Sequence, residues 1–357
     1  MTWSFEIGRL FGSTVRVHVT FFLLLFWIGA AAYVENGQAA AIDSLLFILA
    51  LFACVVAHEY GHALTARRYG IVTRDITLLP IGGMARLERM PEKPGQEILV
   101  ALAGPAVNIV IWAVLALVFG ARASLDDLSV MSPETVSFAA RLASVNLFLA
   151  LFNLLPAFPM DGGRVLRAVV TIFTDRVQAT RIAAAAGQVM AFLLGFLGLA
   201  SGNPLLLLIA FFVYMAAGAE SSEVQLRALA RNMLARDAMI THFESLAPSD
   251  SLHAANMALI HTTQAEFPVL HADGTLAGFL TRNAIFAADK AEHKPLSISE
   301  IMQPAGLTLP LTARLTDALD ALYAENTAAV GITGPNGAMI GFITRENIGE
   351  LMVISGR

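Results

Sequence analysis

The chain has 357 residues, of which 56% are apolar and only 14% are charged. An average globular domain carries roughly 25% charged residues, so this composition is that of a membrane protein and not of an ordinary soluble one. The formal net charge of −5 comes without a basic stripe, so nucleic acid is not expected as a partner. A single cysteine, Cys54, excludes an internal disulfide.

Six apolar runs predict the architecture, because a bilayer-spanning helix needs about 20 mainly apolar residues. The fourth run ends in the segment 156–163, whose two prolines and Gly-Gly pair cannot continue a regular helix. Such backbone is tolerated within a membrane only where it lines a cavity or is covered by protein. We therefore predict an α-helical integral membrane protein with about six transmembrane helices, at residues 17–34, 44–69, 97–120, 135–155, 179–200 and 204–219.

The basic residues predict how these helices are oriented. If the N-terminus is cytoplasmic, about fifteen Lys and Arg residues lie on the cytoplasmic side, whereas the outer side holds Arg122 and, at a helix end, Arg141. Cytoplasmic loops of membrane proteins carry such an excess of positive charge. We expect a multi-pass protein of the plasma or inner membrane with both the N- and the C-terminus in the cytoplasm.

The segment 70–96, between the second and third runs, has a pattern typical of a β-hairpin. Two short β-type runs, Ile76-Thr77-Leu78-Leu79 and Met84-Ala85-Arg86-Leu87, flank a turn that contains Pro80 and Gly82-Gly83. Because the segment is apolar, we expect it to dip into the membrane interface. The alternative is an ordinary amphipathic loop.

Beyond residue 219 the composition becomes that of a soluble domain with a weak internal duplication. Gly278-Phe279-Leu280-Thr281-Arg282 matches Gly341-Phe342-Ile343-Thr344-Arg345, and other short matches share the spacing of roughly 62 residues. Each copy is predicted to be a short helix followed by two strands around a turn. We predict a transmembrane domain over 1–222 and a C-terminal α/β domain over 236–357, with copies at 236–290 and 298–354.

The strongest functional signal lies in the second apolar run, at His58-Glu59-Tyr60-Gly61-His62. Residues i and i+4 of a helix share a face, so both imidazoles can bind one Zn²⁺ at about 2.0–2.1 Å. Glu59 can then serve as general base on the zinc-bound water. Ionisable groups inside an apolar span are costly and functional by default, which favours a metal site over polar groups satisfied within a helix bundle.

Two histidines leave zinc short of a protein ligand, because catalytic zinc usually keeps three protein ligands and one open position. Asp161 is the best candidate for the third ligand. It lies in the broken, glycine-flanked segment, from which a short carboxylate can reach across to another helix. The alternative role for Asp161 is to cap a helix that starts near Gly162.

The motif 58–62, together with Asn153-Leu154-Leu155-Pro156-Ala157-Phe158-Pro159-Met160-Asp161-Gly162-Gly163-Arg164, resembles the site-2 protease family of intramembrane zinc metalloproteases. The likeness is to the prokaryotic branch with a C-terminal pair of cystathionine-β-synthase-type (CBS) domains, and it covers roughly 1–220 and 236–357. It implies a metalloendopeptidase in which His58, His62 and Asp161 hold one Zn²⁺. Glu59 is then the catalytic residue.

A further family element, Ala103-Gly104-Pro105-Ala106-Val107-Asn108, lies on the third apolar run, where its small residues allow close helix contact. Asn108 is a candidate to hydrogen-bond the substrate carbonyl or the developing oxyanion. Asn153 is a weaker candidate for a substrate contact, and an interhelical hydrogen bond is the alternative. His18 is expected to be an interfacial residue and Cys54 a small packing residue.

A CBS pair typically binds an adenine nucleotide between its copies and holds the ribose with a Gly-apolar-apolar-Ser/Thr-x-x-Asp segment. The second copy follows this pattern at Thr344 and Asn347, with Asn in place of Asp. The first copy has Thr281, but Ala284 stands at the key position, which weakens the case for a nucleotide there. The alternative is a ligand-free docking module or one that forms a homodimer.

These features predict an intramembrane zinc metalloprotease that hydrolyses a peptide bond in or near a transmembrane segment of a membrane protein. Regulation is expected through the cytoplasmic CBS pair. One alternative is a CBS-gated membrane transporter, although transport does not require a zinc triad with an adjacent base. Another is an inactive protease-like adaptor, against which the intact motif residues argue.

Overall fold

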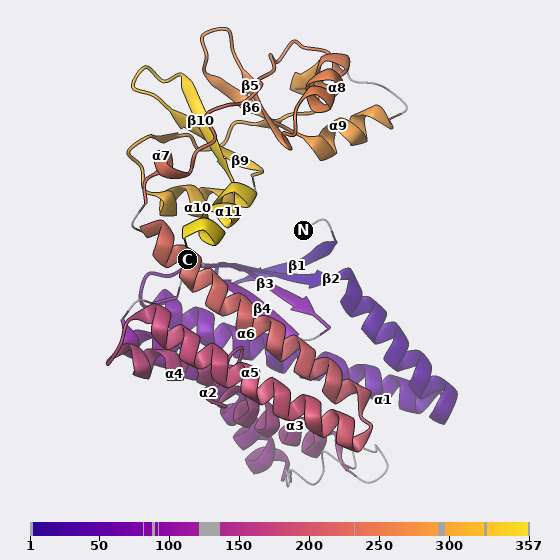
Figure 1. The fold of residues 1–357 in the computed structure, drawn as a ribbon. Helices are drawn as coiled ribbons and strands as arrows, with labels where there is room; N and C mark the ends of the chain where they lie inside the picture. Colours follow the sequence, from indigo (N-terminus) through magenta and orange to yellow (C-terminus); the bar gives the residue numbers. More distant parts are fainter. Residues whose placement is uncertain are drawn as a thin grey trace. The chain divides into compact units, whose positions relative to one another are not determined.

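The computed structural model describes residues 3–80, 82–87, 90–91, 93–120, 136–231, 233–291, 297–324 and 327–355. The chain divides into two compact units, Met1–Ser222 and Glu223–Arg357 (Figure 1). The first unit combines long apolar helices with one small sheet, and the second is a mixed α/β unit.

The sheet of the first unit has the strand order β1-β2-β3-β4, drawn in indigo and purple in Figure 1. The predicted hairpin is present as the antiparallel pair β3 and β4, and β2 pairs with β3 in parallel. The two N-terminal strands were not predicted. They are joined at Phe11 and Gly12, which both have positive φ values, as a two-residue hairpin turn requires. The strands are β1 (Ser4–Leu10), β2 (Ser13–His18), β3 (Thr73–Leu79) and β4 (Gly82–Leu87).

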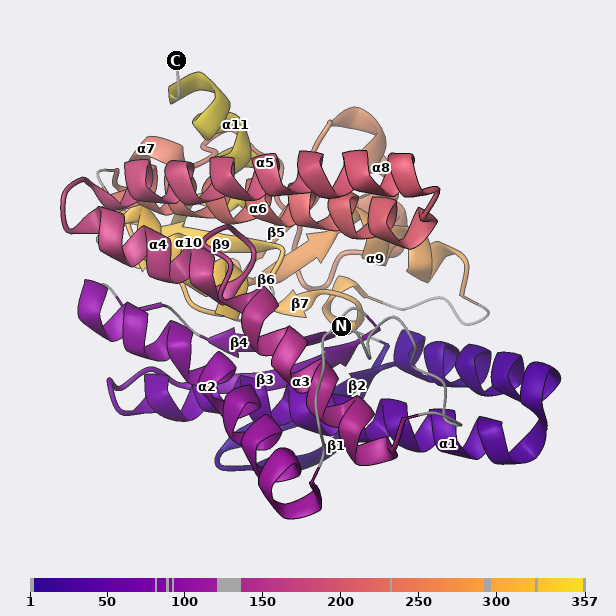
Figure 2. The same cartoon turned by 90° about the horizontal axis from the view of Figure 1, so that it is seen from below.

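Helix α1 (Val19–Arg67) covers most of both the first and the second predicted span. Its helical conformation is interrupted at Gly37, where φ is 80°, and Figure 2 shows the ribbon reversing its direction. The ring centroids of Phe21 and Phe52 are 4.5 Å apart, which places the two halves of α1 side by side. The element is thus a helical hairpin, and glycine suits the reversal because it adopts positive φ without steric cost.

The start of α1 corrects the predicted span at 17–34. Val17 and His18 still belong to strand β2, and the helix begins at Val19. The ring of His18 caps the helix, because His18 Nδ1 accepts a hydrogen bond from the backbone N–H of Thr20. His18 therefore satisfies a helix terminus.

Four helices in the described part of the chain are long and apolar enough to cross a membrane: α1, α2 (Pro94–Phe119), α5 (Arg176–Ser201) and α6 (Pro204–Arg231). Helix α3 (Phe138–Asn153) is apolar but shorter, and the predicted span 135–155 begins outside the described residues. The chain is a membrane protein by these helices, while the count of about six spans stays a prediction.

Helix α6 continues beyond the predicted span 204–219, to Arg231, so the helix is longer than the apolar run. Most of residues 220–231 are good helix formers (Glu, Gln, Arg, Leu and Ala), so the lower hydrophobicity after Ala219 does not end the helix. The predicted break after α3 is present as a turn, from which α4 (Asp161–Thr171) starts.

The second unit repeats one order of elements, helix, strand, strand, helix. The duplication and the first three elements of each copy were predicted, whereas the second helix was not. The strands form two three-stranded sheets of order β5-β6-β7 and β10-β9-β8. Each copy has its own buried core, one around Phe267 and Leu280, the other around Ile332 and Ile343. The elements are α7 (Ala235–Ala238), α8 (Leu252–His261), β5 (Glu266–Leu270), β6 (Leu276–Thr281), α9 (Arg282–Asp289), η2 (Ile298–Glu300), β7 (Gln303–Pro304), β8 (Leu309–Pro310), α10 (Leu315–Ala324), β9 (Ala329–Thr333), β10 (Met339–Thr344) and α11 (Arg345–Ser355).

Candidate metal centre

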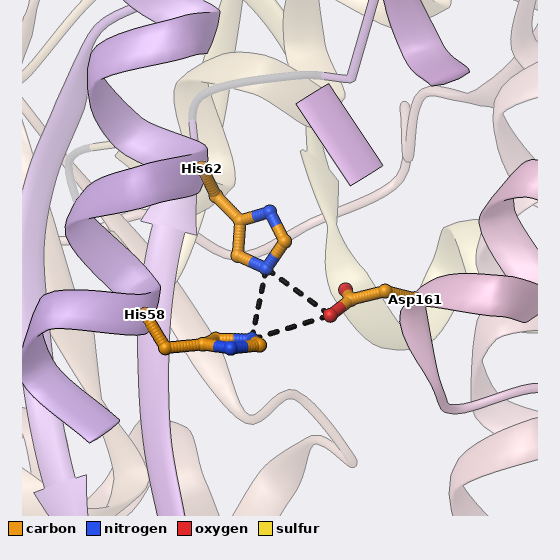
Figure 3. A group of neighbouring side chains, drawn as sticks. All are labelled: His58, His62 and Asp161. Atoms are coloured by element: carbon orange, nitrogen blue, oxygen red, sulfur yellow. Dashed lines mark hydrogen bonds and ion pairs between the residues drawn. The ribbon is translucent and has the colours of Figure 1, made fainter. Parts of the chain in front are cut away.

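Three potential metal ligands from two helices meet in the interior of the first unit (Figure 3). His58 and His62 lie one turn apart on α1, and Asp161 is the first residue of α4. Asp161 Oδ2 is 3.2 Å from the Nε2 atom of each histidine, and the two Nε2 atoms are 3.1 Å apart. All three side chains are buried. The structure thus brings together the three residues that the sequence singled out as ligands.

The orientation of His62 is fixed by a backbone group. His62 Nδ1 lies 2.7 Å from the carbonyl oxygen of Val100, on α2. A carbonyl oxygen can only accept, so Nδ1 carries the proton and the lone pair is left on Nε2, which faces Asp161. The sequence carries no sign of this contact, because a backbone carbonyl is present at every residue.

Asp161 is not the cap of α4. The N-cap position belongs to Met160, and the Asp161 carboxylate is directed at the histidines (Figure 3). The glycine that follows allows this placement, because a Cβ on Gly162 would overlap the carbonyl oxygens of Leu154 and Leu155. The start of α4 can therefore approach the end of the preceding turn closely.

Helix α2 closes the cluster from another side. A Cβ on Gly104 would overlap His62 Nε2 and would lie 2.6 Å from His58 Nε2, so only glycine leaves room at the ligand atoms. Asn108 lies one turn further along α2 and is 1% exposed. In the described part of the chain its Oδ1 atom has no hydrogen-bond partner. A buried amide oxygen in that state is available to a ligand or to water.

Glu59 lies against strand β4. It is half-buried, and a Cβ on Gly83 would stand 2.9 Å from Glu59 Cγ. The glycine therefore lets the strand pass directly over this carboxylate side chain. From the sequence Gly83 is expected in a turn, and its contact with Glu59 is not predicted, although a glycine inside a strand often marks a close approach.

Asn153, Asn146 and Cys54 lie outside the cluster of His58, His62 and Asp161. Asn153 is the last residue of α3 and is half-buried, so its contact with a substrate stays a prediction. Asn146 is buried and donates a hydrogen bond to the backbone carbonyl of Leu142, 2.8 Å away. Cys54 is buried on α1.

In the second unit a cavity of about 320 Å³ is lined by Glu266, Gln303, Thr327, Ala328, Thr344, Arg345 and Glu346. Thr344 caps α11 by accepting from the backbone N–H of Asn347. Asn347 Oδ1 is buried without a partner among the described residues. Thr281 caps α9 in the same way but does not line this cavity.

Comparison with known proteins identifies the family. The model of peptidase family M50 matches residues 46–135 and 126–197. A zinc metalloprotease of Methanocaldococcus jannaschii is 34% identical over 304 residues, which is 84% of this chain and 86% of that protein. The chain belongs to peptidase family M50. The predicted relationship to the site-2 type of zinc metalloprotease is confirmed.

Other similarities extend over both units. A relative of this M50 peptidase in Synechocystis sp. is 29% identical over 368 residues, covering 98% of this chain and 95% of its own length. The solved structure of a site-2 protease from M. jannaschii is 33% identical, covers 61% of this chain and 95% of that one, and gives a TM-score of 0.48. The structure of CBSX2 in complex with AMP is 22% identical over 35% of this chain, with a TM-score of 0.31.

The candidate ligand atoms of this M50 peptidase have the spacing and chemistry that suit a zinc ion. Zinc binds imidazole nitrogens and carboxylate oxygens at about 2.0–2.2 Å, so neighbouring ligands of a tetrahedral ion are about 3.3 Å apart. The three atoms here are separated by 3.1 or 3.2 Å. Two histidines and one carboxylate are also a common donor set of catalytic zinc, and Gly104 keeps the space beside them open.

Proposed function

We propose that this M50 peptidase hydrolyses a peptide bond in or near a transmembrane segment of a membrane protein. The observation that carries the proposal is the cluster of His58, His62 and Asp161 inside a bundle of apolar helices. Ionisable groups at such depth are expensive, and a bound cation explains why three of them converge. Glu59, next to the first ligand, supplies the base that an adaptor or a transporter would not need.

The membrane arrangement is part of the proposal. His58 lies nine residues before the end of α1, or about 14 Å at 1.5 Å per residue, which supports a site inside the bilayer and nearer one face. The excess of basic residues supports cytoplasmic N- and C-termini in a multi-pass protein of the plasma or inner membrane. If the two halves of α1 and the shorter α3 also cross, the count of spans is six.

The residues present suit amide hydrolysis. His58, His62 and Asp161 would hold zinc, which when bound polarises a carbonyl and activates water. Glu59 takes the proton from the attacking water and returns a proton to the leaving amide nitrogen. Asn108 lies one turn from Gly104, and a side-chain amide N–H can donate to the oxyanion. Its Oδ1, which has no partner in the described region, can only accept, for example from a substrate N–H.

The edge of the sheet supports a binding mode for an extended substrate. A helical peptide bond is covered by its own turn, so the substrate must be locally unwound. Strand β4 is at the edge of its sheet, and its Gly83 lies over Glu59. A substrate strand that pairs with β4 would thereby pass close to the general base. Asn153 remains a candidate for a second contact.

Regulation through the C-terminal unit is proposed from its duplicated architecture and its cavity. Thr344 lines this cavity, and the resemblance to a CBS pair assigns Thr344 and Asn347 to the ribose. Asn347 Oδ1, unpaired among the described residues, can accept from a hydroxyl. An adenine nucleotide is the proposed ligand at this copy. Self-association of two CBS pairs, as a homodimer, is the further arrangement that this architecture supports.

The deciding experiment compares the purified wild type with Glu59→Gln in detergent. Both should contain about one zinc per chain, and only the wild type should cleave model transmembrane substrates, with loss of cleavage on chelation. General base catalysis contributes about 10²–10⁴-fold, which sets the expected loss. Absence of zinc from both proteins would overturn the proposal. Equal cleavage by both would remove Glu59 as the base.

A further inference from the structure

Arg167, on α4, is a cation buried deep in the first unit. It is 1% exposed, yet it lies outside the metal cluster. Arg167 Nε donates to Glu97 Oε1 at 2.7 Å, and Arg167 Nη1 donates to Glu220 Oε1 at 2.9 Å. Its guanidinium carbon also stands 5.0 Å from the ring centroid of Phe158. A buried guanidinium stays beside its carboxylate partners, because moving it away would leave a positive charge buried without compensation.

The partners of Arg167 come from separate helices. Glu97, also 1% exposed, lies at the start of α2 and forms a second ion pair with Arg176 of α5 at 3.2 Å. Glu220 lies on α6. Two cations and two carboxylates therefore join α2, α4, α5 and α6 in one balanced network. Such a network specifies the relative positions of the helices more strongly than apolar contacts do, because hydrogen bonds are directional.

The contact with Phe158 connects this network to the metal centre, because Phe158 lies three residues before Asp161. Phe158 is buried in the turn just before Asp161. Its backbone N–H donates to Ala183 O of α5 at 3.2 Å, and a Cβ on Gly187 would overlap its carbonyl oxygen. Helix α5 thus holds the backbone of the turn while Arg167 covers its ring. Asp161 follows three residues later and cannot move independently of this turn.

The contact with Glu220 connects Arg167 to helix α6, which extends into the second unit. The first unit ends at Ser222, but α6 continues unbroken to Arg231 in the second unit. There Ala230 is buried in the core of the second CBS-like copy, and Arg227 Nη1 pairs with Asp320 Oδ1 at 3.0 Å. One helix therefore carries the partner of Arg167 in one unit and core residues in the other.

We propose that Arg167 is a positioning residue for Asp161, and that its pair with Glu220 couples the metal centre to the C-terminal unit through α6. The inference deepens the proposed function, since it rests on Asp161 being a zinc ligand. A displacement of α6 along or around its axis moves Glu220 away from Arg167. The shift passes through Phe158 to the carboxylate of Asp161 and changes how tightly the metal is held.

The test compares Glu220→Gln with Glu223→Gln in the full-length protein. Both changes remove one carboxylate charge from α6, but Glu223 is exposed and pairs with Arg227 one turn away. Two readouts are independent of activity: the rate of zinc transfer to a chromophoric chelator, and the visible absorption spectrum of the Co²⁺-substituted protein. Zinc should leave Glu220→Gln about tenfold faster, the lower end of the effects reported for residues that orient metal ligands. Its Co²⁺ spectrum should differ from that of the wild type.

Identical zinc release and identical Co²⁺ spectra in the two variants would overturn the positioning role. Glu220→Asp and Glu223→Asp provide a second pair of variants, in which the negative charge is kept. This pair tests the role even when Glu220→Gln does not fold. A shortened side chain at 220 should give an intermediate release rate, and no difference between the Asp variants would again overturn the role. If the wild type binds zinc and cleaves substrate while the variants at 220 and 223 behave alike, only this inference is refuted. A wild type without zinc refutes the proposed function.

The coupling is tested by a double-mutant cycle with Asp320→Asn, which breaks the pair with Arg227 in the second unit. Asp320→Asn should change the rate of zinc release in the wild-type background and should have no further effect when Glu220 is already Gln. Independent, additive effects of the two changes, or no effect of Asp320→Asn in the wild-type background, would overturn the coupling through α6.

Discussion

Gly104 of α2 faces the Nε2 atom of His62 so closely that the smallest side chain would overlap it. The same missing Cβ would lie 2.6 Å from His58 Nε2. The space for a metal ion is therefore created as much by an absent side chain as by the ligands. Helix α2 approaches the motif of α1 this closely because residue 104 is glycine and because Gly61 of α1 also lacks a Cβ, which would stand 2.7 Å from the carbonyl oxygen of Ala103.

We predict that Gly104→Ala lowers the zinc affinity at least about tenfold, because the added methyl group occupies the space beside the ligand nitrogens. Zinc content after dialysis against a chelator series measures the effect. Gly95→Ala is the matched control, since it lies on the same helix with open space at its Cβ position. Equal zinc affinity in the two variants would contradict this view of the site.

The pair of Arg141 and Asp43 is predicted to stabilise the packing of α3 on α1. Arg141 Nη2 reaches both carboxylate oxygens, at 2.8 and 2.7 Å, and the guanidinium also lies over the rings of Phe47 and Phe138. Arg141→Lys keeps the charge but loses the planar fork, so the unfolding free energy should fall by about 1–2 kcal/mol.

Thermal unfolding in detergent checks this prediction, with zinc content expected to remain unchanged. Arg9→Lys serves as control, because its pair with Glu6 is exposed and such pairs contribute little. An unfolding midpoint of Arg141→Lys equal to that of Arg9→Lys would show that the ion pair adds nothing to stability.

The nucleotide proposal predicts different effects at two equivalent threonines. Thr344→Val should weaken ATP binding about tenfold, the value of one hydrogen bond near 1.4 kcal/mol, whereas Thr281→Val should leave it unchanged. Both variants lose the same kind of helix cap, so their stabilities are matched. Titration calorimetry of the full-length protein measures the affinity. Equal weakening, or no binding to the wild type, would remove the assignment to the second copy.

Glu266 is expected to make the C-terminal unit less stable as pH rises. Burial and the nearby carboxylate of Glu346 raise the pKa of Glu266. A carboxyl whose pKa is higher in the folded state favours folding while it is protonated, and that contribution is lost as pH rises through the folded-state pKa. Glu266→Gln should therefore slow amide hydrogen exchange in β5 at neutral pH but not below about pH 4.

The exposed Glu350, on α11, provides the control for Glu266. Glu350→Gln should leave exchange in β5 unchanged at every pH. A gain in protection for Glu266→Gln that persists unchanged in acid would point to a packing effect and not to the charge.

Several elements follow from local sequence rules alone. His58 and His62 share a helix face because of their spacing, and the break before Asp161 follows from prolines and glycines that cannot continue a helix. The hairpin of β3 and β4 and the duplicated C-terminal unit are visible for the same reason, since turns and repeats depend on neighbouring residues.

Other elements could not be predicted from the sequence, because the residues they pair with are distant in the chain. Strand β2 pairs with β3 about 60 residues later, and the sequence around Val15 and Val17 does not predict that pairing. Helix α6 extends beyond the apolar run 204–219, because hydrophobicity marks where a helix can meet lipid and not where the helix ends.

By itself, the sequence determined the chemistry available to this protein: two histidines and a glutamate on one helical turn, an aspartate in a broken segment, and apolar helices around them. Only the tertiary structure decided that Asp161 Oδ2 lies 3.2 Å from both Nε2 atoms, that Gly104 opens the space beside them, and that Arg167 of α4 pairs with carboxylates of α2 and α6. The physical reason is range. Spacing along a helix is set by local backbone geometry, whereas contacts between helices depend on close packing across the whole fold.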